Sequence, residues 1–118
     1  MKPPLEIRVA AGILGIGAVL FVALALARAD GALQFPVIVA TLALLVVPLL
    51  LKRIRFARPV GLTVIILISL AHMLIALGPL PWWARTASGV LAAAHVYAAI
   101  LLLTAPARRY LDGVPDDE

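Results

Sequence analysis

Four long apolar runs, separated by charged residues, are the feature that most constrains this chain. They cover about residues 9–27, 31–51, 60–78 and 86–105. Each supplies roughly the 20 residues that a helix needs to cross about 30 Å of hydrocarbon. Lipid offers no hydrogen-bond partners to an open backbone, and none of the runs alternates polar and apolar residues as a barrel strand does. We therefore expect an all-α, polytopic membrane protein, with four transmembrane helices in one domain over residues 1–118.

The composition supports a membrane protein. Hydrophobic residues make up 64% of the chain and charged residues 14%, whereas soluble domains average about 45–50% and 25%. A soluble chain of this length has too little interior to hide that much apolar surface. The first run exceeds the 7–15 residues that are typical of a signal peptide, which predicts a retained helix. The net charge of +4 comes from residues that flank the runs, so we expect no nucleic-acid partner.

Short connections and flanking charges predict the topology. The segments 27–33, 52–58 and 78–85 are short, which favours two consecutive antiparallel hairpins. Basic residues near the spans concentrate on the cytoplasmic side of a membrane. One side carries Lys2, Arg8, Lys52, Arg53, Arg55, Arg58, Arg108 and Arg109, and the other carries Arg28 and Arg85. This excess predicts an inner (cell) membrane protein with both termini cytoplasmic, including a short acidic tail at 110–118.

Small residues predict where the helices pack. Lipid tails are as apolar as leucine, so transmembrane helices associate where small side chains let their backbones approach. The expected packing residues are Ala11, Gly15, Ala18, Ala92 and Ala99. The second run consists mostly of long aliphatic residues. We therefore expect its helix to be the most lipid-exposed, or to face another subunit.

The four spans contain no Asp, Glu, Lys or Arg. Pumps and proton-coupled transporters usually hold a charged side chain inside the membrane. Small multidrug transporters rely on a glutamate in their first helix, and four-helix fluoride channels have an asparagine in their pore. The first span has no glutamate and the chain has no asparagine, which argues against both families.

Two histidines are the polar exceptions within the spans. His95 lies ten positions after Arg85, and His72 six positions before Gly78. The residues of a possible polar path or ligand site are His72, His95, Tyr97, Ser69 and Ser88. A neutral, hydrogen-bonded structural role is the preferred interpretation, with a proton relay or b-type haem ligation as alternatives. The four-residue difference in depth, about 6 Å along the axis, argues against haem, so we expect no cofactor, no metal and no catalytic residue.

The basic segment between the second and third runs has two interpretations. It sets the topology, or it also binds anionic lipid head groups. The candidate lipid contacts are Lys52, Arg53, Arg55, Arg58, Arg108 and Arg109.

Two function classes fit these features. The first is a non-catalytic accessory, assembly or self-associating subunit, whose partners are membrane lipids and another membrane protein or a second copy. The second is a transporter or channel for a small or lipophilic solute, acting as an oligomer with a polar path near His72 and His95. An enzyme is not expected, because no nucleophile–base pair is visible.

The topology gives a first testable prediction. Reporter fusions after Glu118 and at Arg55 should report a cytoplasmic location, and fusions at Asp30 and Pro81 an external one, because the basic excess lies on one side. A cytoplasmic signal at Asp30 would contradict the four-span topology, since it would mean that the first helix does not cross.

Overall fold

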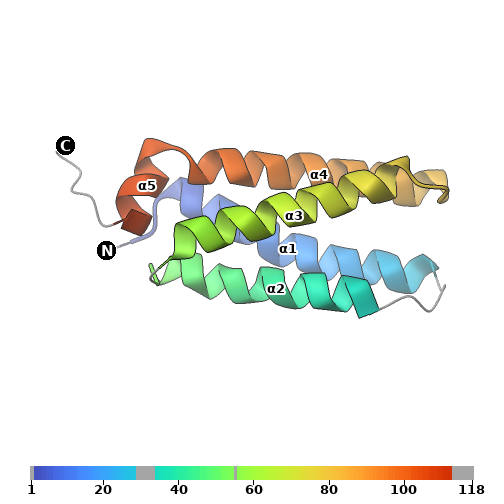
Figure 1. Ribbon diagram of the computed structural model, residues 1–118, viewed down its shortest axis with the longest axis horizontal. Helices are drawn as coiled ribbons and strands as arrows, with labels where there is room; N and C mark the ends of the chain where they lie inside the picture. The colour runs from blue at the N-terminus through green and yellow to red at the C-terminus, as the bar shows by residue number, and fades with distance from the viewer. Residues whose placement is uncertain (1, 29–33, 55, 113–118) are drawn as a thin grey trace.

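The computed structural model describes residues 2–28, 34–54 and 56–112, and the regular elements within them are helices. These are α1 (Leu5–Arg28), α2 (Gln34–Leu51), α3 (Ala57–Leu77), α4 (Trp82–Leu102) and α5 (Ala105–Asp112). The four long helices lie side by side along the long axis (Figure 1). The start of α1 and the short helix α5 lie at the same end of the bundle (Figure 1).

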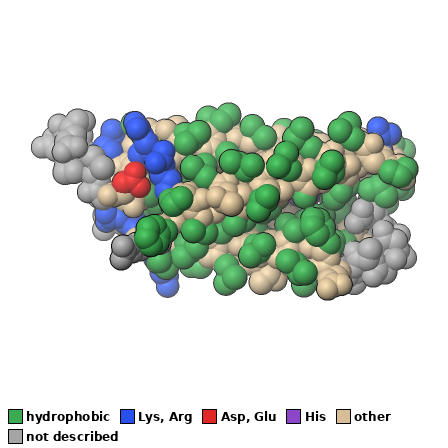
Figure 2. All heavy atoms as spheres, viewed as in Figure 1, with side chains coloured by type: hydrophobic (Ala, Val, Ile, Leu, Met, Phe, Trp, Pro, Cys, Tyr) green, Lys and Arg blue, Asp and Glu red, His purple; other side chains and the backbone are tan. Residues whose placement is uncertain are grey.

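Four helices, α1 to α4, are long and apolar enough to cross a membrane. The molecule measures 51 × 20 × 18 Å, so it is longer than the roughly 30 Å of a hydrocarbon core. The helices continue past the apolar runs, and α1 includes Glu6 and Arg8. Figure 2 shows hydrophobic side chains along this face, with most of its Lys and Arg side chains at the α5 end.

Each long helix contacts two others. The contact between α3 and α4 is the most extensive, followed by α1 with α2, α1 with α4, and α2 with α3. Ala40 and Ala43, the close pair of small residues in α2, are both buried. The sequence predicted α2 to be the most lipid-exposed helix, but α2 packs extensively on α1 and is as buried as α3.

The predicted packing residues differ in their surroundings. Ala11, Ala18 and Ala92 are buried, and Ala99 and Gly15 are half-buried. A Cβ built at Gly15 would meet no neighbouring atom within 4 Å, whereas one at Gly17 would overlap His95. The close approach of α1 to another helix is therefore seen at Gly17.

Long aliphatic side chains fill the core toward the α5 end. The largest fully buried ones there include Ile7, Leu14, Leu50, Ile65 and Leu102. Two histidine side chains, His72 and His95, are also fully buried.

Helix α5 was not anticipated from the sequence, which predicted that the fourth helix continues to about residue 105. Pro106 suits the first turn of a helix, where its missing N–H has no partner to lose. Ala107 and Tyr110, three positions apart, lie on one face and are buried. Residues 113–118 of the predicted acidic tail lie outside the described residues, and residues 110–112 belong to α5.

Side chains from α5 and from the segment after α2 satisfy free carbonyl groups at helix ends. The last four carbonyls of a helix have no partner within it. The Tyr110 hydroxyl donates to the Leu51 carbonyl at 2.6 Å. Arg53 Nε donates to the Tyr110 carbonyl at 2.7 Å, and its guanidinium lies 5.2 Å from the Tyr110 ring centroid. These contacts fasten α5 to the end of α2.

Arg53 also ends α2. Its φ of 54° lies in the left-handed region, and the Ile54 N–H donates to the Leu49 carbonyl at 3.1 Å. This is the helix-terminating bond of a Schellman motif, a position that glycine usually fills. The hydrogen bond and cation–π contact of Arg53 with Tyr110 offset the steric cost of a side chain there.

Replacing Tyr110 by Phe tests this attachment. Tyr110→Phe removes the donor to Leu51 and should lower the free energy of unfolding in detergent by about 1 kcal/mol. Tyr97→Phe is the matched control, because Tyr97 is 54% exposed and Tyr110 only 4%. Equal melting temperatures for the two variants would show that the hydrogen bond does not stabilise the bundle.

Candidate functional site

The two histidines of the spans meet inside the bundle. His72 of α3 is 0% exposed and His95 of α4 is 1% exposed. Their ring centroids lie 5.6 Å apart, and the ring planes are inclined by 34°. The depth difference expected from the sequence therefore does not separate them. Two imidazoles lie side by side in an apolar interior.

His95 is held in one tautomer. Its Nδ1 lies 2.7 Å from the carbonyl oxygen of Leu91, one turn earlier on α4. A carbonyl oxygen only accepts, so Nδ1 must donate and therefore carries the proton. In the neutral ring, Nε2 then presents a lone pair.

Helix α1 supplies the wall opposite the two rings. The ring centroids of Phe21 and His72 lie 4.5 Å apart. Phe21 also makes an edge-on contact with Phe35 of α2, with ring centroids 6.2 Å apart. One turn before Phe21, a Cβ at Gly17 would lie 2.7 Å from Cε1 and 3.2 Å from Nε2 of His95. Glycine at position 17 thus lets α1 approach the imidazole edge.

Sequence reasoning missed both Gly17 and Phe21. The signal was the four-residue spacing between them, which places a small residue and a large aromatic on one helix face. Small residues are frequent throughout α1, however, so composition did not distinguish Gly17 from Gly12 or Gly15.

The His72 ring has no hydrogen-bond partner. Neither its Nδ1 nor its Nε2 finds one, although both atoms are buried. A buried polar group without a partner costs about 1–3 kcal/mol. Such groups are rare and often indicate a missing water or ion, or a functional role. His72 is therefore the most unusual group of the interior.

The structure does not gather all five residues of the predicted polar path. Ser69 and Ser88 are buried. The Ser69 hydroxyl donates to the carbonyl of Ile65 in its own helix at 2.9 Å. Tyr97 is 54% exposed and points away from the interior. Of the five predicted residues, His72 and His95 are the two that contact each other. Within the described residues, no continuous row of polar side chains leads to them.

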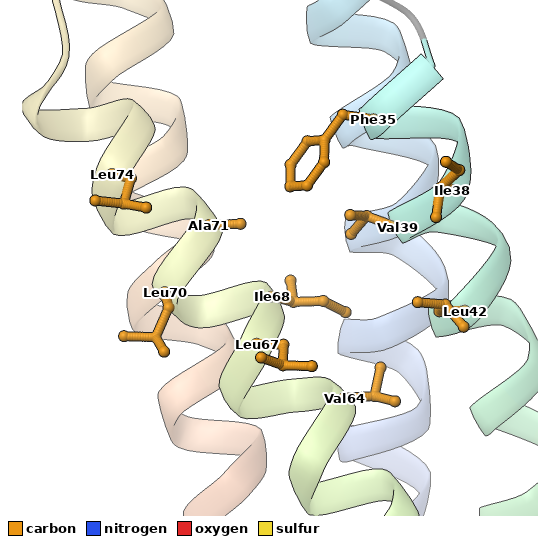
Figure 3. Close-up of a pocket in the computed structure, with 10 residues that line it drawn as sticks. All are labelled: Phe35, Ile38, Val39, Leu42, Val64, Leu67, Ile68, Leu70, Ala71 and Leu74. Atoms are coloured by element: carbon orange, nitrogen blue, oxygen red, sulfur yellow. The ribbon is translucent and has the colours of Figure 1, made fainter.

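Two apolar grooves run along the outside of the bundle. One, about 370 Å³, lies between α2 and α3, and Figure 3 shows Phe35 at one end and Val64 toward the other. The other, about 440 Å³, lies between α1 and α4 and is lined by Gly12, Gly17 and Ala94 among others. All residues that line the two grooves are apolar.

A porphyrin does not fit the surroundings of the two histidines. Haem needs a flat slot beside its axial ligands, with access for its propionates. Neither groove is lined by His72 or His95. Phe21 packs against one ring and Gly17 against the other. We therefore propose no role for haem in this protein.

The basic residues near α5 divide into two groups. Arg53 is bonded to Tyr110, and Arg58 donates from Nε to the Leu102 carbonyl at 3.3 Å. Arg58 also lies 3.7 Å from the carboxylate of Asp112. Lys52 and Arg108 are exposed, Arg109 is half-buried with a contact of its own, and Arg55 lies outside the described residues.

No group of three His, Cys, Asp or Glu side chains that could hold a metal ion gathers within residues 2–28, 34–54 and 56–112. The chain matches no known protein family, no curated protein and no solved structure.

Replacing glycines in α1 tests the approach to His95. Gly17→Ala should lower the free energy of unfolding by about 1–3 kcal/mol, because the new methyl group overlaps the imidazole. Gly12→Ala and Gly15→Ala are controls, since a Cβ at either meets no neighbour within 4 Å. Detergent melting curves measure the effect. Similar losses in all three variants would refute a specific contact at Gly17.

Proposed function

We propose that this chain is a small, non-catalytic subunit of the inner cell membrane that associates with a second copy of itself. It crosses the membrane four times as two antiparallel hairpins, with both termini in the cytoplasm. The extensive α1–α2 and α3–α4 contacts support the hairpins. The excess of basic residues on one side supports the orientation.

The observation that carries this proposal is the outward position of small residues on α1. Gly12 and Gly15 have no neighbour within 4 Å of a Cβ position. Gly12 also lines the groove between α1 and α4, together with Ala94. In lipid, helices associate where glycine and alanine let two backbones approach. A transmembrane helix of a second copy would fill this groove.

A symmetric dimer is the simplest arrangement of two copies. Its two-fold axis places the same surface of both subunits in contact. With Gly12 near that axis, the two α1 helices would cross close to each other at this residue. Such a crossing buries the outward glycines and the apolar groove together.

Anionic lipid is the second proposed partner. Lys52 and Arg108 are exposed at the α5 end, and juxtamembrane basic residues attract anionic head groups. Helix α5 is amphipathic, with Tyr110 buried and Arg108 exposed. The helix would lie at the head-group level of the cytoplasmic leaflet.

A subunit role is better supported than transport of a polar solute. A transporter for small solutes needs a polar path, whereas both described grooves are apolar. Of the predicted path residues, Tyr97 is exposed and Ser69 is bonded within its own helix.

Cysteine cross-linking tests the association, because the chain contains no cysteine of its own. The Gly12→Cys variant should form a disulfide-linked dimer in oxidised membranes, since a disulfide requires Cα atoms about 4.4–6.8 Å apart. Gel electrophoresis with and without reductant measures the dimer.

The control is Ile66→Cys, on the exposed face of α3. It should remain monomeric under the same oxidation. A Gly12→Cys variant that forms no dimer, or forms no more than Ile66→Cys, would contradict self-association through α1.

A further inference from the structure

The buried histidines carry an inference that does not depend on self-association. His72 is completely buried and leaves both ring nitrogens without a partner. No hydrogen bond fixes its tautomer, so either ring nitrogen can carry the lone pair. A binding role is one explanation for an unpaired buried polar side chain.

The hydrogen bond of His95 leaves one ring nitrogen able to bind a metal ion. Its Nδ1–H bonds to the Leu91 carbonyl, so Nε2 keeps its lone pair. Histidines that bind metals almost always donate their other N–H to a carbonyl or carboxylate, which fixes the ring. The His72 ring lies next to it, at a centroid distance of 5.6 Å. Two imidazole rings, each with a nitrogen lone pair when neutral, thus lie next to each other.

The number and type of donors select the ion. Structural zinc sites take four ligands, and calcium and magnesium take oxygen ligands. The described residues hold no third His, Cys, Asp or Glu beside the pair. A monovalent ion with a filled d shell, such as Cu(I) or Ag(I), accepts two donors in line, and imidazole is a suitable donor for copper. Cu(II) prefers four ligands in a plane, which this site does not offer.

The surroundings also suit a single positive charge. Burial of charge in a membrane is costly, so a monovalent ion is favoured over a divalent one. The centroid of the Phe21 ring lies 4.5 Å from that of His72, so the pair has an aromatic neighbour. Gly17 lines the α1–α4 groove and lies against the Cε1–Nε2 edge of His95.

We propose that His72 and His95 form a two-coordinate site for a monovalent d¹⁰ cation of the Cu(I) class. Both ligands are neutral imidazoles, and the protein supplies an apolar enclosure around them. The two ligands come from α3 and α4, so bound cation would stabilise the contact between these helices.

The test uses the purified full chain in detergent, without oxygen, and titrates it with Cu(I) against a colorimetric Cu(I) chelator. We expect about one equivalent of Cu(I) per chain, in keeping with one pair of imidazole donors. Ag(I), which needs no reductant, should bind with the same stoichiometry. X-ray absorption of the Cu(I) form should show two nitrogen neighbours.

The matched variants are His72→Met and His72→Leu, which have similar volumes. The thioether of methionine is a soft ligand for Cu(I), so His72→Met should retain binding and His72→Leu should lose it. Both variants should keep their helical circular dichroism. Binding by His72→Leu equal to that of the original chain would overturn the proposal, as would no binding by the original chain. Equally tight binding of Zn(II) would overturn the choice of a two-coordinate ion.

Discussion

The approach of α1 to the histidine pair is the contact on which the packing of α1 against α3 and α4 depends. The rings of His72 and His95 are fully buried in an otherwise mostly apolar interior. Gly17 and Phe21 lie one turn apart on α1. Gly17 packs against the ring of His95, and Phe21 packs against the ring of His72. A larger residue at 17 would push α1 away from α4 and open the interior to lipid.

The α5 end of the bundle is stabilised by other contacts. Aliphatic side chains fill its core, and Gly61 lets Leu50 and Leu102 approach α3. At this end, Arg53, Arg58 and Tyr110 donate hydrogen bonds to carbonyls that end three helices. The basic residues that indicate topology in the sequence are therefore partly used as helix caps. Lys52 and Arg108 are exposed, and we propose that they contact anionic head groups.

The sequence predicted the helices better than their packing. Apolar runs and the hydrogen-bonding demands of lipid required four long helices, whatever their neighbours. Gly15 and Gly17 differ only in the face on which they lie, and a helix rich in small residues gives no signal to separate them. Helix α5 has a detectable pattern, the spacing of Ala107 and Tyr110, but it is too short to stand out beside the spans. The unpaired nitrogens of His72 depend on every surrounding side chain, so no sequence pattern would reveal them.

A double-mutant cycle between Gly17 and His95 tests the central contact most directly. The free energy of unfolding would be measured for Gly17→Ala, for His95→Ala and for the double variant. Removal of the imidazole makes room for the methyl group, so Gly17→Ala should cost almost nothing in the His95→Ala background. The account predicts a coupling energy of about 1–3 kcal/mol between the two positions. Additive effects within about 0.5 kcal/mol would contradict it, because they would mean that α1 does not meet His95 at Gly17.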